Sequence, residues 1–275
     1  MSIMSVRTNI ASMSAAGQLG RTNKGLASSL GKISSGIRIN SASEDAAGLG
    51  VATNLESSVI STRQAMRNTN DGISIIQTAE SAANEVTDIL QRMRELAIQS
   101  SSETLADTER SFITDEFNQL RSEVSRIASV TEFNGLQLTD GTTSSLSVQV
   151  GIQNASSSRI DITLGDLTTS GLGIDSLDLS SVSAARTSID SLDTALNSVN
   201  SFRSQFGAVQ NRLDSALNNS QVNVEALSAA GSQIMDTDFA TETSNLTKLQ
   251  IMQQAGVASL AQAKNINQSV ISLLS

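Results

Sequence analysis

The chain contains no histidine, cysteine, proline, tryptophan or tyrosine, and only 6 phenylalanines. Without histidine there is no imidazole to act as a general base, and without cysteine there is no thiolate nucleophile and no soft-metal site. These absences exclude catalysis that depends on either residue. They leave the redox compartment open, because the lack of cysteine removes disulfides and reactive thiols alike.

The scarcity of aromatic residues and the lack of proline also constrain the fold. Aromatic side chains supply much of the burial in compact cores, so a core in this chain must come from Leu, Ile, Val, Met and Ala. These residues suit long seams between helices. Because no proline interrupts a helix or removes a backbone donor, the composition predicts long helices.

Charge and hydropathy argue against two classes of partner. The formal net charge of −9 disfavours nucleic acid and anionic lipid. No apolar stretch approaches the ~20 residues that span a bilayer, and the N-terminus lacks the apolar core of a secretory signal peptide. Composition alone therefore predicts a cytoplasmic protein with no membrane or nucleic-acid partner.

Apolar residues recur at spacings of three and four, which is typical of amphipathic helices. They predict long helices over residues 44–99, 107–129 and 182–227. Ser41 and Glu44 have the spacing of a capping box at the start of the first of these, and Asp45 adds negative charge to its first turn.

The predicted helix over residues 44–99 is too long for a globule. At 1.5 Å per residue it would measure about 80 Å, whereas a compact chain of this size is about 50 Å across. The pattern favours an extended rod over a helix broken at Asp71-Gly72.

The middle of the chain has a different pattern. Apolar and polar residues alternate around Val148 and Ile162, which predicts a β-hairpin region over residues 136–179, with glycine- and serine-rich margins that are the most exposed part of the molecule. The predicted fold class is mainly α: a long antiparallel helical rod or coiled coil with a small β-hairpin region in the middle of the chain.

Both ends of the chain carry apolar stripes that a single chain leaves without an obvious partner. In the N-terminal stripe, Asn23 is the position that breaks the seam. The predicted packing residues are Leu19, Leu26, Leu30, Ile33, Ile37, Leu246, Leu249, Leu260, Val270 and Leu274. Such ends indicate burial against each other or against other copies, and thus an assembly protein.

Acidic residues near predicted turns are the remaining candidates for chemistry. The close groups are Glu44 with Asp45, and Asp236, Asp238 and Glu242. Helix N-termini attract carboxylates for electrostatic reasons, and no EF-hand spacing is present. We therefore predict no enzyme, no catalytic or metal-binding residue, and no cofactor.

Seven segments near the two ends of the chain are specific enough to compare with known families. They are SSGIRINSASEDAAG at 34–48, NTNDGISIIQTAE at 68–80, QRMRELAIQS at 91–100, FNG at 133–135, FGAVQNR at 206–212, QIMQQAG at 250–256 and LAQA at 260–263. These segments resemble the bacterial flagellins, and the similarity covers about residues 3–136 and 180–274.

The resemblance implies a subunit of the flagellar filament, used for swimming motility and exported unfolded to the cell exterior. This replaces the cytoplasmic location that composition predicts. It implies an inner coiled-coil core domain of residues 1–40 and 236–275, and an outer rod domain of residues 41–235. Implied partners are other copies of the chain, an export chaperone, the filament cap and the hook–filament junction proteins. With only about forty residues between the conserved halves, the large variable outer domains of many flagellins are expected to be absent.

The resemblance also implies a contact surface for the vertebrate innate immune receptor for flagellin. The matching positions are Gln91, Arg92, Glu95, Leu96 and Glu116, for which packing between subunits is the alternative role. Two other functions stay open: a hook–filament junction protein that forms a short ring, and a cytoplasmic coiled-coil signalling rod.

Overall fold

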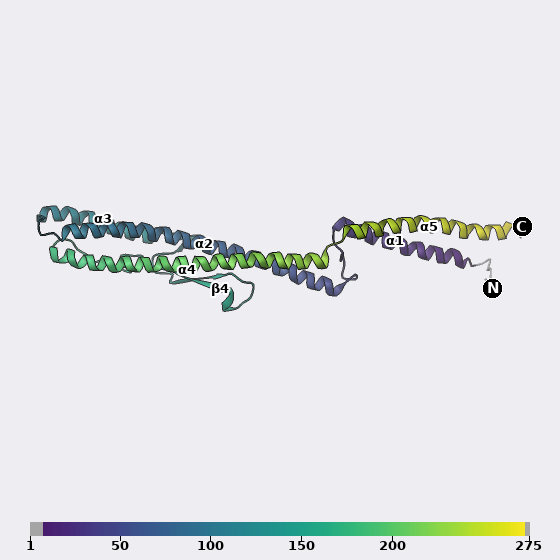
Figure 1. Cartoon of the computed structure of the whole chain (residues 1–275), viewed down its shortest axis with the longest axis horizontal. Coiled ribbons are helices and arrows are strands. Elements are labelled where there is room, and N and C mark those ends of the chain that lie inside the picture. Colours follow the sequence, from purple (N-terminus) through teal and green to yellow (C-terminus); the bar gives the residue numbers. More distant parts are fainter. Residues whose placement is uncertain (1–7, 273–275) are drawn as a thin grey trace. The chain divides into compact units, whose positions relative to one another are not determined.

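Helices account for most of the chain in the computed structural model, which describes residues 8–272, with side chains up to residue 265. The helices are α1 (Ile10–Ser35), α2 (Ala46–Ser100), α3 (Asp107–Val130), α4 (Val182–Met235) and α5 (Phe239–Ser272). The strands are β1 (Glu132–Phe133), β2 (Leu136–Gln137), β3 (Ser145–Gln149) and β4 (Arg159–Thr163). The predicted mainly α class with a small β region in the middle of the chain is confirmed (Figure 1).

The chain divides into two compact units. One comprises Met1–Ser57 with Ala226–Ser275, and the other comprises Ser58–Glu225. Both boundaries fall inside helices, α2 and α4, so the units are distinguished by packing and not by linkers. The division into residues 1–40 with 236–275 and residues 41–235 stays a prediction.

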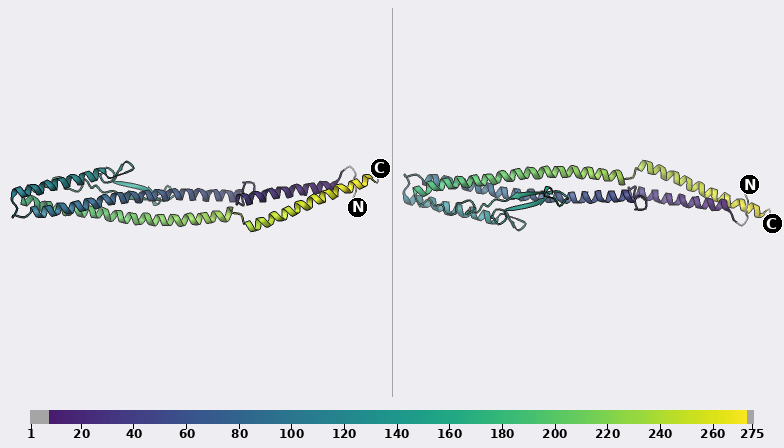
Figure 2. Two further views of the ribbon diagram at one scale, coloured as in Figure 1. Left: turned by 90° about the horizontal axis from the view of Figure 1, so that it is seen from above. Right: turned by 90° about the horizontal axis from the view of Figure 1, so that it is seen from below.

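In the unit of residues 58–225, α2, α3 and α4 lie side by side around one apolar core (Figures 1 and 2). The stripe on α2 that includes Val86, Leu90 and Met93 is fully buried. It meets Phe117 of α3 and Leu192 of α4. Spacings of three and four place these side chains on one face of each helix, and their burial stabilises the three helices.

The β3–β4 hairpin packs against α2 and α4 in a second apolar cluster. The strands are antiparallel, with Leu146 opposite Ile162 and Val148 opposite Ile160. Because alternate residues of a strand share a face, these four side chains all point into the cluster. Gly72 of α2 leaves room for Val148, since a Cβ at Gly72 would lie 3.0 Å from that side chain.

Three predictions about element boundaries were wrong. The hairpin pattern does not continue to residue 179: Leu167, Leu172 and Ile174 follow β4 without forming a strand and are buried in the three-helix core. The apolar side chains of this margin are therefore covered, because they fill the space between the helices, whereas the serines and glycines of residues 170–176 are exposed. Before the β3–β4 hairpin, a two-residue turn at Asn134-Gly135, with φ 51° and 77°, joins β1 to β2.

Two helix ends also differ from the predictions. Asp45 caps α2 in place of Ser41, because its Oδ1 accepts the backbone N–H of Gly48 at 2.8 Å, whereas Glu44 turns back to the N–H of Asn40. Helix α4 continues to Met235 instead of ending near residue 227. Its last turns have no regular apolar stripe, but they contain no residue that stops a helix.

Candidate interaction surfaces

Helices α1 and α5 pair along their length in opposite directions (Figure 2). Asn9 Nδ2 donates to the backbone oxygen of Ala263 at 2.9 Å. Further along, Gln253 Nε2 donates to Asn23 Oδ1, also at 2.9 Å. The two helices are therefore antiparallel.

The seam between α1 and α5 contains small and polar residues as well as leucines. On α1, the buried positions are Thr22 and Ser29, which alternate at threes and fours with half-buried Leu19, Leu26 and Ile33. On α5, the corresponding series runs through Leu246, Leu249, Gln253, Gly256, Leu260 and Ala263. A seam of this composition buries little apolar surface, so two helices alone are marginally stable.

The structure places most of the predicted packing residues on this seam. Half-buried side chains of the seam are Leu19, Leu26, Ile33, Leu246, Leu249 and Leu260, and Ile37 is half-buried in the connection that follows α1. Leu30 is the exception: it is 49% exposed, and Ser29 takes its place on the seam. The side chains of Val270 and Leu274 lie outside the described residues. Asn23, predicted to break the seam, lies at its edge and bonds to Gln253.

The α1–α5 pair leaves many large apolar side chains in water. They are Ile10, Met13 and Leu30 on α1, and Phe239, Ile251, Met252 and Val257 on α5, with exposed fractions from 37% to 67%. Exposed large apolar side chains mark interaction sites where they gather on a surface. We call these residues, all of which lie outside the α1–α5 seam, the outer apolar face of the pair.

The segment that follows α1 is hydrogen-bonded to the segment that joins α4 to α5. The backbone of Ile37 forms a β-bridge with Asp236, Arg38 N donates to Met235 O at 2.6 Å and Thr237 N donates to Gly36 O at 2.9 Å. The guanidinium of Arg38 also donates to the backbone oxygen of Ile234 at 2.8 Å. Arg38 thus satisfies carbonyls that the end of α4 leaves unpaired.

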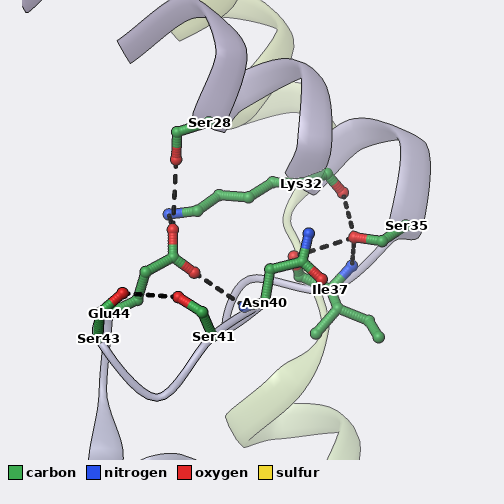
Figure 3. A network of polar contacts seen from close by, with 8 residues as sticks. All are labelled: Ser28, Lys32, Ser35, Ile37, Asn40, Ser41, Ser43 and Glu44. Atoms are coloured by element: carbon green, nitrogen blue, oxygen red, sulfur yellow. Dashed lines mark hydrogen bonds and ion pairs between the residues drawn. The ribbon is translucent and has the colours of Figure 1, made fainter. Parts of the chain in front are cut away.

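A polar network holds residues 36–45, which we call the elbow, against α1 (Figure 3). Glu44 Oε2 accepts the N–H of Asn40 at 2.8 Å. Its Oε1 accepts from Ser28 at 3.2 Å and lies 3.6 Å from Lys32 Nζ. The bond from Asn40, and after it the charge of Lys32, lower the pKa of the Glu44 carboxyl.

Acid is expected to loosen the elbow. Because the folded pKa of Glu44 lies below its ordinary value of 4.5, its contribution is complete above that value and is lost as the pH falls through the lowered pKa. Hydrogen-exchange protection of the Asn40 amide should fall across that range. Glu44→Gln, which holds no charge at any pH, should show weak protection with no such step. An equal step in both proteins would contradict the assignment.

An ion cluster links α2 to α3 on the surface of the unit of residues 58–225. Arg92 bonds to Glu116 at 2.8 Å and to Glu95 at 3.0 Å, and these bonds, Glu116 first, raise the pKa of the Arg92 guanidinium. Gln91 is exposed nearby in sequence, whereas Leu96 is 1% exposed and belongs to the core. Of the five predicted receptor residues, four therefore present side chains to solvent, and Leu96 is buried.

Phe112, which the sequence patterns did not single out, lies one turn before Glu116 on α3 and is 69% exposed. The sequence could have revealed it through its position on the helix. The buried stripe of α3 runs through Ile113 and Phe117, so an aromatic residue one position before Ile113 points away from the core. Arg94 of α2 was not predicted either; it forms an ion pair with Asp193 of α4 at 2.5 Å.

Of the acidic candidates near the start of α5, Asp238 caps the helix. Asp238 Oδ1 accepts the N–H of Ala240 at 2.9 Å and Oδ2 accepts the hydroxyl of Thr241 at 2.7 Å. The bond from that hydroxyl is the main reason why the pKa of Asp238 is lowered. Within residues 8–272, no group of three acidic side chains is placed to hold a metal ion, and no helix has the length and apolar character needed to cross a membrane.

Comparison with known proteins finds matches in both the N-terminal and the C-terminal part of the chain. The model of the bacterial flagellin N-terminal helical region matches residues 6–144, and that of the C-terminal helical region matches residues 189–274. The flagellin of Halalkalibacterium halodurans is 40% identical over 272 residues, which cover 98% of this chain and 100% of that protein. The flagellar filament 33 kDa core protein of Treponema phagedenis is 38% identical over 287 residues, with the same coverage.

A solved structure shows the same helical plan. The crystal structure of Bacillus cereus flagellin is 34% identical, with a TM-score of 0.51, and covers 56% of this chain and 88% of that one. The 272-residue alignment spans the whole Halalkalibacterium protein, so neither chain carries a large insert relative to the other. The chain therefore belongs to the bacterial flagellin family, the structural subunits of flagellar filaments, as a minimal member without large outer domains.

Proposed function

We propose that copies of this chain polymerise through the outer apolar face of the α1–α5 pair, which then forms the inner layer of the filament. The supporting observation is the exposure of Ile10, Met13, Leu30, Ile251 and Val257 on helices whose mutual seam is small. Neighbouring copies supply the cover that one chain lacks. The role is structural and not enzymatic.

The energetics favour ordering of the pair on assembly. Each large apolar side chain moved from water contributes about 1.5–3 kcal/mol, and the outer apolar face offers several per copy. Fixing a residue's backbone costs about 1–2 kcal/mol, which is comparable for helices of this length. We therefore expect the terminal helices to be weakly protected in a dilute monomer and strongly protected in the polymer, so that growth requires a templated end.

We also propose where the protein acts and which partners it meets. The protein acts outside the cell after export through the flagellar apparatus. It meets an export chaperone before assembly, and the filament cap and the hook–filament junction proteins at the growing structure. The family membership supports this sequence of partners.

Seeded polymerisation of the purified protein, followed by electron microscopy, tests the assembly function. Long filaments are the expected product. Short rings would favour a hook–filament junction protein. Monomers that stay fully protected against hydrogen exchange in α1 and α5, and that do not polymerise on seeds, would favour the signalling rod.

We also propose that the ion cluster of Arg92, Glu95 and Glu116, with Gln91, contacts the vertebrate flagellin receptor. The cluster is exposed, it fixes the Arg92 side chain between two helices, and arginine is frequent among residues that dominate binding. Subunit packing stays the alternative role of the same surface.

Replacing Arg92 with alanine is expected to weaken binding of the monomer to that receptor by about tenfold or more, or ~1.4 kcal/mol. Surface plasmon resonance with the receptor ectodomain measures the effect. Arg126→Ala is the matched control, because Arg126 is an exposed arginine of α3 that pairs with Glu123 at 2.5 Å. If both variants bind like the parent protein, the proposed contact is wrong.

A further inference from the structure

Two leucine–glycine contacts flank the hydrogen bond between Asn23 and Gln253 in the α1–α5 seam. A Cβ placed on Gly256 of α5 would lie 3.3 Å from the Cδ1 atom of Leu19. A Cβ placed on Gly25 of α1 would lie 3.3 Å from a Cδ atom of Leu249. Each helix therefore contributes one leucine and one glycine, and each leucine fills the space that the opposite glycine leaves.

These contacts are specific to two of the glycines in the pair. Gly17 and Gly20, on the same helix as Gly25, have nothing within 4 Å of the position of a Cβ. Glycine in a helix interior is destabilising relative to alanine, so a glycine that admits a leucine offsets this cost with packing.

The rest of the seam offers little to select one alignment of the helices. Thr22 and Ser29 are the buried residues of α1, and seams of half-buried leucines at heptad spacing pack similarly after a shift of one heptad. A shift of seven residues would move Leu19 off Gly256 and Leu249 off Gly25 together.

We propose that Leu19–Gly256 and Gly25–Leu249 are the residues that determine the register in which α1 pairs with α5 of the same chain. They act as two reciprocal knobs and holes, with the Asn23–Gln253 bond between them. The inference does not require a polymer. It identifies which residues set the geometry of the pair before or during assembly.

A disulfide between positions 19 and 256 can report whether the two helices pair in this register. The Cβ position of Gly256 lies 3.9 Å from Leu19 Cβ, which is close to the ideal Cβ separation of a disulfide, and the chain has no other cysteine. The full-length double variant Leu19→Cys/Gly256→Cys, oxidised at high dilution, should form an intrachain disulfide with loss of two hydrogens to the oxidant, because weakly protected helices still pair transiently and the disulfide traps the pair. Mass spectrometry and non-reducing electrophoresis detect it.

The register is then challenged at the other contact. Adding Gly25→Leu to the reporter should lower the initial rate of disulfide formation by at least tenfold, because the new side chain meets Leu249. Adding Gly20→Leu, which changes helix propensity in the same way but has open space, should leave the rate unchanged. Exchanging knob and hole, with Gly25→Leu and Leu249→Gly together, should restore most of the rate.

Three results would overturn the proposal: no disulfide in the reporter, an interchain disulfide, or an equal rate with Gly25→Leu. A folding defect is distinguished by the Gly20→Leu control and by the knob–hole exchange. Seeded polymerisation of the parent chain is measured separately, so failure of the filament function and failure of the register proposal give different outcomes.

Discussion

Replacement of Leu30 with aspartate is expected to abolish filament growth while leaving the subunit folded. Leu30 is 49% exposed on α1, and Ser29 takes its place on the seam with α5, so the change leaves the residues of the seam in place. In a polymer, the same position would be covered by a neighbouring copy. Burial of an unpaired carboxylate costs several kcal/mol, and each ~1.4 kcal/mol lowers an association constant tenfold.

Sedimentation and electron microscopy of seeded reactions measure this effect through the critical concentration. We expect an increase of at least about a hundredfold for Leu30→Asp. Leu30→Met is the matched control, because it keeps an apolar side chain of similar volume at the same position. Normal growth of the aspartate variant would show that Leu30 stays in water in the filament, and the outer apolar face would then be assigned wrongly.

The second large effect is expected in the three-helix core. Phe117 is fully buried between α2, α3 and α4, and the chain has only 6 phenylalanines. Truncation of Phe117 to alanine removes its burial and leaves a cavity, which should lower the free energy of unfolding by about 3–5 kcal/mol. Denaturation in urea, followed by circular dichroism, measures the loss.

Phe112 provides the control on the same helix. It is 69% exposed, so Phe112→Ala should change the free energy of unfolding by no more than about 0.5 kcal/mol. The two variants carry the same chemical change in the same helix and differ in burial. Equal effects would contradict the assignment of Phe117 to the core.

The long helices were predictable because their apolar residues are regular. The α2 stripe through Val86, Leu90 and Met93 keeps spacings of three and four, and no proline interrupts it. The end of α4 was not predictable in this way, because a helix can continue to Met235 without an apolar stripe when nothing stops it. The segment after β4 was misassigned because leucines in a loop and in a strand give similar short patterns.

The candidate surfaces were predictable only in part. The apolar stripes located the α1–α5 seam, but whether Ser29 or Leu30 belongs to it depends on how the two helices are rotated. Leu96 and Arg92 both lie in a segment that resembles other flagellins, yet one is in the core and the other on the surface. Only the packing of α2 against α3 separates them.

The amino-acid sequence by itself determined the class of protein. The lack of histidine and cysteine, the long apolar stripes and the family segments at both ends indicated a helical assembly subunit, because composition and spacing act locally along the chain. Tertiary structure decided which side of each stripe is covered. That choice depends on side chains distant in sequence, such as Gly256 beside Leu19 and Leu249 beside Gly25, and no local pattern contains it.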